Sequence, residues 1–534
     1  MLLQYLLFCL LLYCDAVIIS HYVNFTLEPD TLQLPEFRER HPLPIGLLTS
    51  SAGEPVDLRD MVTLNTEVFN RQFHLETILH LDGERTPERV VHAKGIGAYG
   101  YFEVTNDVSE YTKADVFNGV GKKTPVFARF STQIASLGGN DVERTTKSIA
   151  AKFYTKEGNL DFLGIHIPIF AFNDPVLFTS FARATRRNPR TGIPDPTLLW
   201  DLVVMRPELM HIILWLQSDV GIPNGYRKMD NFLIHPYEIN NAKGETFYVK
   251  FNFRSELGLD NLTSTEAQII TGETLDYYNR DLYNAIAEKN YPSWRIEMDV
   301  MTMEDLKTVE YNPFDHTVLW KPGTYHTVPI GRMVLNRHVE NHFKDSEQSA
   351  FNPANLVPGI PGPIDFLFKA RRVSYLDTQN YRLSRNHNNI LVNKPKFAMT
   401  YTRDARPPNS HNMMDVPNYF PNSYSGPAPL VDETKPKQII LPLTSQAVDL
   451  GETNNFYNVV VESDAHRQRI ADNIAATLLT VNAMTLKNVI WLLTLTDPDL
   501  GHRTKMSLKE QRSARATHRE DRMERIAECI ARFS

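Results

Sequence analysis

Residues 88–104 read ERVVHAKGIGAYGYFEV and contain the pattern G-x-G-x-x-G at 95–100. In dinucleotide-binding folds this pattern opens a helix whose N-terminus faces a pyrophosphate. Here the residues that follow, YFEV at 101–104, alternate like a β-strand. The stretch therefore predicts a strand and argues against a dinucleotide-binding turn.

Further segments on the C-terminal side have strand character. PVFARFS at 125–131 and AAKFYTKEGNLDFLG at 150–164 are rich in β-branched and aromatic residues. Within the second, EGN at 157–159 is typical of a hairpin turn. Two later segments, GETFYVKFNFRS at 244–255 and WRIEMDVMTM at 294–303, have the same character and are also predicted to be strands.

Helical periodicity appears in two other regions. Residues 198–217, LLWDLVVMRPELMHIILWLQ, carry apolar residues at helical spacing that is interrupted at Pro207, which predicts two helices. Helices return after about residue 450, with Ser463 as the expected N-cap. From Lys505 the chain is mostly charged and is expected to form a solvated helix or tail. Together with the strands, these regions predict an α+β chain.

The composition excludes several classes of protein. Of the 534 residues, 42% are hydrophobic and 22% are charged, so the chain can bury a sizeable core and is not a disordered protein. The formal net charge of -7 provides no global basic field for binding nucleic acid. Three cysteines, at positions 9, 14 and 529, are too few for a Cys-rich zinc or iron–sulfur site or for a disulfide framework.

The N-terminal apolar stretch is expected to direct the chain to the secretory pathway. Residues 2–14, LLQYLLFCLLLYC, are short for a membrane span, which takes about 20 residues, and they fit a signal peptide over 1–20. Because no Lys or Arg lies near Met1, a buried N-terminal segment is the alternative. Sequons at Asn24 and Asn261 are compatible with export. The chain ends without a peroxisomal Ser-Lys-Leu signal, so secretion is favoured over a peroxisomal location, and no stable membrane span is expected.

A long region after the predicted strands is rich in Pro, Asn and Gly, with runs such as NPANLVPGIPGP. A structureless loop of that length inside a compact domain would be unusual. The region, over 321–445, is therefore interpreted as a wrapping segment that lies over other surfaces, with another subunit as a candidate. An extended arm at 21–75 has the same need for a partner, because neither segment can pair its backbone groups on one subunit.

Two elements carry residue types suited to proton or metal chemistry. His92 follows two valines at the head of the predicted strand, and such a histidine taken alone is usually a core residue. In RRVSYLDT at 371–378, Arg371 and Tyr375 are four residues apart and share a face if the segment is helical. A guanidinium held against a phenol lowers the pKa of the phenol and favours an anionic oxygen, which suits ferric iron. From these residues alone, a Tyr-Arg surface pair is the alternative.

Seven sequence blocks occur in one order and resemble those of the monofunctional haem catalases, from about residue 45 to 502. The spacings from His92 to Arg129 and from Arg129 to Tyr375 are also similar to those of this family. The resemblance implies a catalase-like antiparallel β-barrel core, haem b with its iron as the cofactor, hydrogen peroxide as the substrate and a homotetramer. The blocks are ERVVHAKGIGAYGYFEV, FARFST, AAKFYTKEGNLDFLG, IPIF, NPFD, MVLNR and RRVSYLDT.

The same resemblance, combined with the composition along the chain, predicts the division into domains. The proximal haem ligand would lie outside the barrel domain in sequence. The predicted parts are a signal peptide at 1–20, an N-terminal arm at 21–75, a β-barrel haem domain with inserted helices at 76–320, a wrapping segment with the proximal ligand at 321–445, a C-terminal helical region at 446–503 and a charged tail at 504–534.

By resemblance, His92 is the distal histidine and Ser131 is its hydrogen-bond partner, while Tyr375 is the proximal ligand of the iron with Arg371 as its partner. The resemblance implies that His92 takes a proton from the peroxide and returns it to the leaving oxygen, and that a second peroxide is then oxidised to oxygen. The other expected cofactor contacts are the propionate-facing Arg89, Arg129 and Arg382, the channel residue Val91 and the distal aromatic residues Phe170 and Phe178.

Several residues depart from the family's pattern, and those at the distal pocket and at the family's NADPH site bear on function. The position of the family's distal asparagine falls on Ile165, which cannot hydrogen-bond peroxide, and loss of one such donor typically costs about 2–4 kcal/mol in the transition state. His166 is adjacent but is expected to face the opposite side of the strand, with a local shift as the alternative. Stable NADPH binding is not expected, because Val220 stands where the family has a phosphate-binding arginine and Asp230 replaces an asparagine.

Three functions are consistent with these residues. The first is a secreted haem catalase whose activity is reduced by Ile165. The second keeps the haem and His92 but uses them for peroxidase turnover or for transforming an organic hydroperoxide, because an apolar Ile165 suits a bulkier, less polar substrate. The third is a non-catalytic haem-binding or structural relative. The residues for haem binding are more complete than those for turnover.

Overall fold

The chain divides into two compact units, which are Met1–Arg85 with Tyr283–Asn290 and Thr86–Leu282 with Tyr291–Ser534. The predicted signal peptide and the sequon at Asn24 lie outside the part of the chain that is described. Every predicted site residue belongs to the second unit. The computed structural model describes residues 28–61, 72–409, 413–434 and 450–533.

The first unit contains the helices α2 (Gln33–Arg40) and α3 (Gln72–Gly83), neither of which buries a residue. The extended arm expected over 21–75 is therefore partly helical where the structure describes it. In α2, Glu36 lies in the first turn and Arg40 in the last, so that both charges complement the helix dipole. This charge pattern outweighs the Pro and Gly residues that suggested an extended arm.

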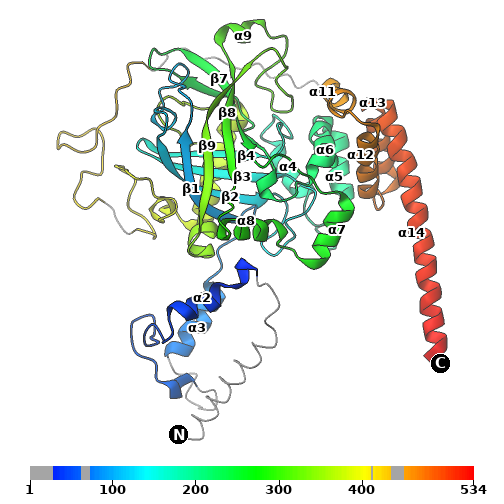
Figure 1. Cartoon of the computed structure of the whole chain (residues 1–534), viewed down its shortest axis with the longest axis horizontal. Helices are drawn as coiled ribbons and strands as arrows, with labels where there is room; N and C mark the ends of the chain where they lie inside the picture. The colour runs from blue at the N-terminus through cyan, green and yellow to red at the C-terminus, as the bar shows by residue number, and fades with distance from the viewer. Residues whose placement is uncertain (1–27, 62–71, 410–412, 435–449, 534) are drawn as a thin grey trace. The chain divides into compact units, whose positions relative to one another are not determined.

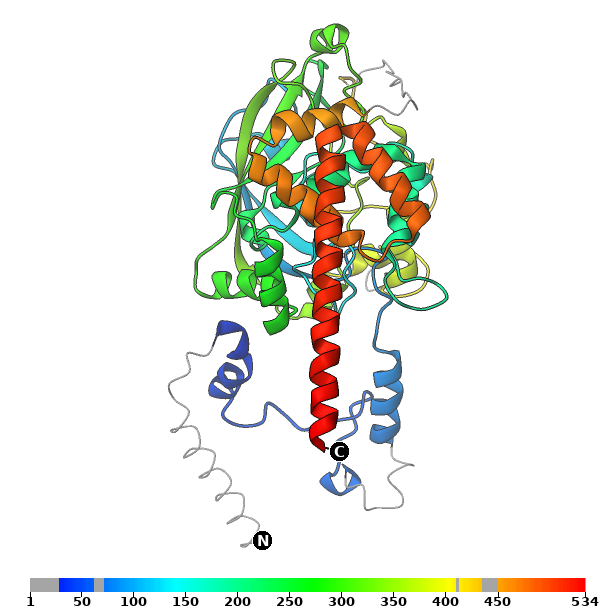
Figure 2. The same ribbon diagram turned by 90° about the vertical axis from the view of Figure 1, so that its right-hand side faces the viewer.

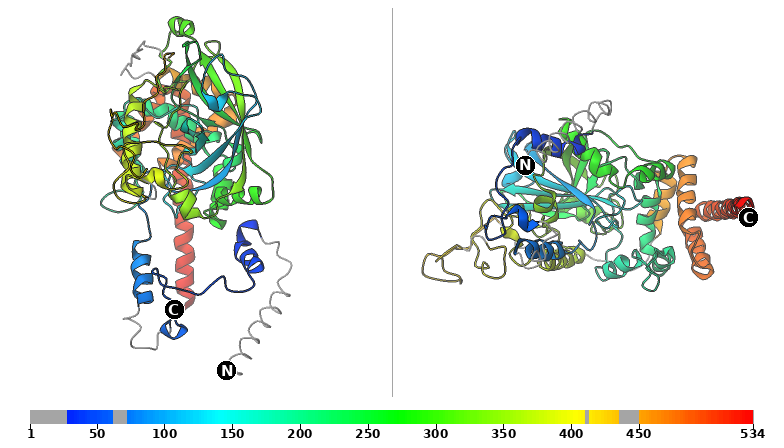
Figure 3. Two further views of the ribbon diagram at one scale, coloured as in Figure 1. Left: turned by 90° about the vertical axis from the view of Figure 1, so that its left-hand side faces the viewer. Right: turned by 90° about the horizontal axis from the view of Figure 1, so that it is seen from below.

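An antiparallel β-barrel forms the centre of the second unit (Figures 1 and 3). Among the described residues the sheet has nine strands, in the order β5-β4-β3-β2-β1-β9-β8-β7-β6. Because β5 also pairs with β7, the strands other than β6 close into a ring, and the predicted barrel is confirmed. The strands are β1 (Gly95–Val104), β2 (Lys123–Thr132), β3 (Lys147–Thr155), β4 (Gly158–Ile165), β5 (Asn231–Phe232), β6 (Tyr237–Asn240), β7 (Thr246–Ser255), β8 (Ser293–Met301) and β9 (His326–His338).

The glycine-rich stretch at 95–100 lies inside β1 and does not precede a helix, as predicted. An added Cβ at Gly97 would come within 2.6 Å of Ser346 Oγ. One at Gly100 would collide with the backbone oxygen of Val334. These glycines therefore allow neighbouring segments to approach β1 closely, which is a packing role and not a phosphate-binding one.

Strand β9 is the largest difference from the sequence-based expectation. It lies within the region 321–445 interpreted as a wrapping segment, yet it pairs with both β1 and β8 at the centre of the sheet order. Its register with β8 shifts between Ile296 and Glu297, which lie opposite Gly331 and Pro329. A proline is tolerated in a sheet at such an irregularity, so Pro329 does not interrupt the strand although it conceals the strand in the sequence.

Helices pack beside the barrel, and α14 runs alongside α12 and α13 (Figure 2). The predicted interruption at Pro207 is confirmed by a 3-10 turn between α5 and α6, and Ser463 caps α12 by accepting from the backbone N of His466. No helix among the described residues combines the length and the apolar character that a membrane crossing needs. The remaining helices are α4 (Leu177–Ala184), α5 (Pro196–Met205), α6 (Met210–Gln217), α7 (Ser264–Glu273), α8 (Tyr277–Ala287), α9 (Met303–Thr308), α10 (Phe366–Leu383), α11 (Gly451–Asn455), α12 (Asp464–Thr477), α13 (Ala483–Thr496) and α14 (Pro498–Phe533).

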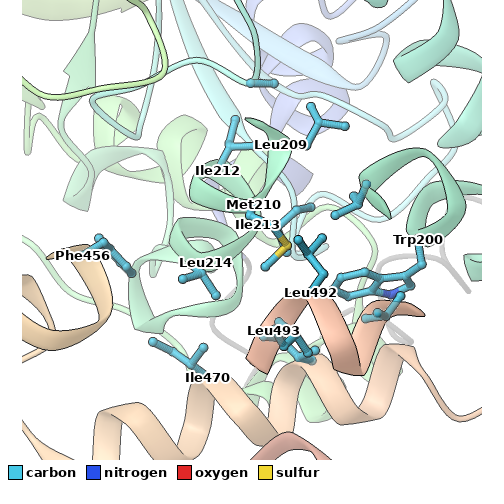
Figure 4. Close-up of a cluster of buried hydrophobic side chains, with 14 of the residues drawn as sticks. Trp200, Leu209, Met210, Ile212, Ile213, Leu214, Phe456, Ile470, Leu492 and Leu493 are labelled. Carbon is cyan, nitrogen blue, oxygen red and sulfur yellow. The ribbon is translucent and has the colours of Figure 1, made fainter. Parts of the chain in front are cut away.

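The main apolar cluster of the second unit lies between these helices. Figure 4 shows Ile213 and Met210 of α6 facing Leu492 and Leu493 of α13, and all four side chains are buried. The helix α14 passes without a break through residues 503 and 504, where the charged tail was predicted to begin. Its first part is held by burial of Leu500 against the same cluster, so the change from apolar to charged sequence does not end the helix.

Candidate active site

His92 lies where the chain enters β1. Its φ is 64°, which is uncommon for a residue with a Cβ, and its backbone N donates to the oxygen of Gln133 at 2.8 Å. Ser131 on β2 pairs with Gly95 of β1. The Oγ of Ser131 lies 3.0 Å from Nδ1 of His92. The structure thus brings together the two residues that the sequence predicted to be catalytic.

The surroundings of His92 keep its ring uncharged. Burial lowers the pKa of His92 to about 3, and the positive charges of Arg129 and Arg89 act in the same direction. Ser131 occupies Nδ1, whereas Nε2 has no hydrogen-bond partner among the described residues. A neutral imidazole with a free nitrogen can accept a proton, and its low pKa favours giving that proton back.

Arg89, Arg129 and Arg382 converge on Glu347. The NH1 of Arg89 lies 3.3 Å and the NH2 of Arg129 lies 3.7 Å from Oε1 of Glu347. The NH2 of Arg382 donates to the backbone oxygen of Glu347 at 2.8 Å. Burial lowers the pKa of all three arginines, and their mutual repulsion adds to this effect for Arg89 and Arg382. Sequence reasoning identified the three arginines but missed the glutamate that holds them together.

Glu347 is expected to make stability depend on acid pH. Burial opposes its ionisation, but a hydrogen bond with His342 and the charges of Arg89 and Arg129 lower its pKa from 4.5 to about 2. The folded state is therefore stabilised above pH 4.5, by about 3 kcal/mol, and this contribution is lost as the pH falls towards 2. In Glu347→Gln, the free energy of unfolding should change less between pH 4.5 and 2 than in the unsubstituted protein. An equal loss in both proteins, measured by denaturant titration at each pH, would contradict this assignment.

Helix α10 carries Arg371 and Tyr375 one turn apart, as predicted. Asp365 is the N-cap of this helix, and its side chain accepts from the backbone N of Phe368. The NH2 of Arg371 lies 3.2 Å from the phenolic oxygen of Tyr375. Burial opposes the charge of Arg371, but the interaction with Tyr375 prevails and the pKa of Arg371 is raised. The guanidinium therefore stays charged against the phenol.

Two buried residues behind Arg371 were not found by sequence reasoning. The NH1 of Arg371 lies 2.7 Å from Nε2 of His235, although the two residues are 136 positions apart. Nδ1 of His235 in turn lies 2.9 Å from Oδ2 of Asp365. No local signal marks this contact in the sequence, because His235 follows the short strand β5 and reaches α10 only through the closed barrel.

The register of the sheet places Ile165 on the same face as Ser131. Gly95 pairs with Ser131, Ser131 with Ser148, and Ser148 with Ile165, across β1, β2, β3 and β4. Directly opposed residues of antiparallel strands project to one face, and neighbouring strands are about 4.8 Å apart. Ile165 therefore lies two strands from Ser131, on the face where Ser131 contacts His92.

The other apolar residues predicted for the distal pocket share one property with Ile165. Phe170 and Phe178 are, like Ile165, only partly buried and pack against the main apolar cluster. Val91 is also partly buried.

His166 is buried instead, with Nδ1 accepting from the backbone N of Lys147 and Nε2 bound to the backbone oxygen of Val220. The local shift that would let His166 replace a missing donor is therefore not present.

The residues in place fit a haem group. Nε of Arg129 is buried without a hydrogen-bond partner among the described residues, so it retains a donor for a carboxylate such as a haem propionate. Tyr375 offers an oxygen held by a guanidinium, which is a known type of ligand for haem iron. These residues therefore supply a donor for a propionate and an oxygen ligand for the iron.

A family model described as Catalase matches residues 49–426. The chain belongs to the catalase family. Proteins of this family depend on haem, which agrees with the residues just described. The two predictions that the sequence resembles this family and that it encodes an enzyme are both confirmed.

Individual relatives support the same conclusion over nearly the whole chain. The catalase of Glandirana rugosa is 39% identical over 484 residues, which cover 89% of this chain and 91% of that protein. Catalase-2 of Caenorhabditis elegans is 37% identical over 498 residues, covering 91% and 99%. The structure of a bacterial catalase superposes with a TM-score of 0.82 at 32% identity, covering 90% of this chain and 99% of that chain.

Proposed function

We propose that this catalase-family chain decomposes hydrogen peroxide to water and oxygen with haem b, at a rate reduced by Ile165. The observation that carries the proposal is the uncharged His92, whose Nδ1 lies 3.0 Å from Oγ of Ser131 and whose Nε2 has no hydrogen-bond partner in the part of the chain that the structure describes. A second feature supports it, because Arg371 holds the oxygen of Tyr375 at 3.2 Å. One nitrogen for proton transfer and one oxygen for the iron are what peroxide decomposition needs from the protein.

Each of the predicted site residues has one role in this reaction. Bound haem supplies the iron at which peroxide is cleaved. Tyr375 would hold the iron, and Arg89, Arg129 and Arg382 would hold the propionates. Nε2 of His92 accepts a proton from the peroxide and returns it to the leaving oxygen. The contact of Ser131 with Nδ1 fixes the orientation of the ring and leaves Nε2 for this proton transfer.

The distal pocket lacks one polar group for this reaction. Ile165 lies on the face of Ser131 and carries no donor. Its neighbour His166 has both ring nitrogens bound to the backbone. Peroxide is therefore positioned by His92 without a second hydrogen-bonding side chain at position 165. Turnover is slower than it would be with both groups.

Ile165→Asn is expected to increase oxygen evolution by at least about tenfold, because a positioned donor contributes about 2–4 kcal/mol in the transition state. The measurement is the initial rate of oxygen evolution from hydrogen peroxide, normalised to haem content. Ile165→Leu is the matched control, since it changes the shape of the side chain without adding a donor, and its rate should not rise. Equal rates for all three proteins would mean that Ile165 does not line the distal pocket.

The main alternative is a peroxidase or an enzyme acting on an organic hydroperoxide. The observation in its favour is the partly exposed apolar set of Ile165, Phe170 and Phe178, which would accommodate a less polar substrate. In that case Ile165→Asn should slow turnover of cumene hydroperoxide, because the asparagine places a polar group in an apolar pocket, and should help hydrogen peroxide only slightly. A third possibility, a haem protein without turnover, predicts a Soret band with no activity on either peroxide.

We further propose that stable NADPH binding is absent. A cavity of about 630 Å³ is lined by Val220, Asp230 and Arg254, among other residues. Oδ2 of Asp230 accepts from NH1 of Arg254 at 3.0 Å, and Glu297 accepts from its Nε at 2.6 Å. The arginine is thus already neutralised, and Val220 offers no charge, so neither of these two residues supplies a free cation for a dinucleotide phosphate. The lysines Lys250 and Lys321 also line the cavity, but they face the rings of Trp320 and Tyr311.

The assembly and location of the chain are also proposals. A homotetramer is supported by the exposed apolar side chains Leu43, Ile45 and Leu47 in the first unit and by Val373 on α10, since such groups are commonly covered by a partner. Secretion rests on the apolar run near the N-terminus, which lies outside the described residues. A peroxisomal location is the less favoured alternative.

A further inference from the structure

Three groups of the kinds that bind metal ions meet next to the start of α10. His235, His316 and Asp365 are buried, and their potential ligand atoms lie within 4.8 Å of one another. Nδ1 of His235 is 3.0 Å from Nε2 of His316, and Nε2 of His316 is 3.4 Å from Oδ1 of Asp365. Two imidazoles and a carboxylate at these separations could hold zinc or could share a proton. The positions of the protons on the two histidines distinguish a zinc site from a shared proton.

Arg371 determines where the proton of His235 lies. A guanidinium has only donors, so at 2.7 Å from NH1 of Arg371 the Nε2 of His235 must accept. Burial lowers the pKa of His235 to about 4, and the uncharged ring then carries its single proton on Nδ1. A metal ion on Nδ1 would force this proton onto Nε2, against a donor of Arg371. The contact with Arg371 therefore disfavours a metal ion held by all three groups.

Asn173 determines the orientation of His316 in the same way. Nδ2 of Asn173 donates to Oδ1 of Asp315 at 2.7 Å, and its Oδ1 accepts from the backbone N of His316 at 2.8 Å. The amide cannot be turned round, because a carboxylate only accepts and a backbone N–H only donates. Nδ1 of His316 lies 2.7 Å from the same Oδ1, so this nitrogen donates. In the uncharged ring, Nε2 of His316 is then an acceptor.

One N–H group consequently faces two acceptors. Nδ1–H of His235 lies 2.9 Å from Oδ2 of Asp365 and 3.0 Å from Nε2 of His316. A donor shared in this way gives each acceptor a weaker bond. Because Asp365 receives less of the proton, the imidazole of His235 becomes less electron-rich, and its Nε2 is a weaker acceptor for Arg371.

We propose that His316 is a positioning residue for the proximal ligand, acting through His235 and Arg371. By sharing the proton of His235, His316 weakens the hold of His235 on Arg371, so that the guanidinium binds the oxygen of Tyr375 more strongly. The chain of contacts continues from His316 through Asn173 to the partly buried Asp315. The inference rests on the proposed role of Tyr375 as the ligand of the iron.

Three variants separate the two ring nitrogens of His316. His316→Gln keeps an acceptor near the position of Nε2, His316→Asn keeps only a donor towards Asn173, and His316→Leu keeps neither. The readout on haem-loaded protein is the rhombic splitting of the high-spin ferric electron paramagnetic resonance signal, which depends on the proximal oxygen. Haem content per subunit is measured in parallel.

The splitting should shift in His316→Leu and His316→Asn and should remain close to that of the unsubstituted protein in His316→Gln, at unchanged haem content. An identical splitting in all four proteins would overturn the proposal. A shift of equal size in His316→Gln and His316→Leu would also overturn it, because the side chain would then act only by filling space.

A second set of measurements does not require haem. Neutron diffraction on the unsubstituted protein should show deuterium on Nδ1 of both His235 and His316 and none on Nε2 of His316. Deuterium on Nε2 of His235, or a zinc ion bound at one per subunit and lost in His316→Leu, would refute the proton-sharing arrangement. Should the purified protein fail to take up haem at all, the proposed function fails, whereas the neutron result still tests the arrangement of protons.

Discussion

Tyr375→Phe is expected to yield a protein that does not retain haem, seen as loss of the Soret band after gel filtration. The substitution removes the phenolic oxygen, which is the expected ligand of the iron. It also leaves Arg371, a partly buried cation, without the group that lies 3.2 Å from its NH2. A charge shielded from water that loses its partner is destabilising in itself, so the folded fraction is measured alongside by circular dichroism.

Tyr381→Phe is the matched control for this experiment. Tyr381 lies on the same helix as Tyr375 and is 76% exposed, so that loss of its hydroxyl should leave haem uptake unchanged. A folded Tyr375→Phe protein with a normal Soret band would refute the assignment of the ligand. Loss of haem in both variants would show that haem binding is sensitive to any substitution on α10. The assignment of Tyr375 as the ligand of the iron would then be tested by spectroscopy of the haem-loaded, unsubstituted protein.

His92→Ala is expected to retain haem and to lose most of its turnover, by roughly 10²–10⁴-fold, which is the usual contribution of a positioned acid–base group. His92 is not a ligand of the iron in the proposed site, and the substitution leaves the three arginines and Tyr375 in place. The Soret band is therefore expected to remain while the rate of oxygen evolution falls. Both are measured on one preparation.

An exposed histidine provides the control for His92. His502 lies on the surface of α14, and His502→Ala should change neither haem content nor rate. Undiminished oxygen evolution in His92→Ala would exclude Nε2 of His92 as the group that moves the proton. Loss of haem in His92→Ala would indicate that the positive-φ turn at this residue supports the cofactor site as a whole.

Much of the fold could be predicted because its signals are local. The strand β1 was recognised from alternation over a few residues, and the break between α5 and α6 from Pro207, whose ring cannot continue a helix. The strand β9 could not be predicted in this way. Pro329 and Gly331 obscure its alternation, and its stability comes from pairing with β1 and β8 on both sides.

The same distinction holds for the active site. Ser131 and His92 were paired by resemblance, and their 3.0 Å contact is present in the structure. Glu347 and His235 were missed, although each holds a predicted residue in place. Arg89 and Glu347 are 258 positions apart, and no periodicity relates residues at that distance.

The amino-acid sequence by itself determined the elements that depend on neighbours within a few positions, such as the cap at Ser463 and the face shared by Arg371 and Tyr375. Only the tertiary structure decided which distant groups meet those elements. The pKa of Glu347 and the tautomer of His235 depend on burial and on groups brought in from distant parts of the chain. The position of Ile165 on the face of Ser131 depends on the pairing of β4 with β3 and of β3 with β2. Because burial and Coulomb interactions act through space and not along the chain, these properties exist only in the folded molecule.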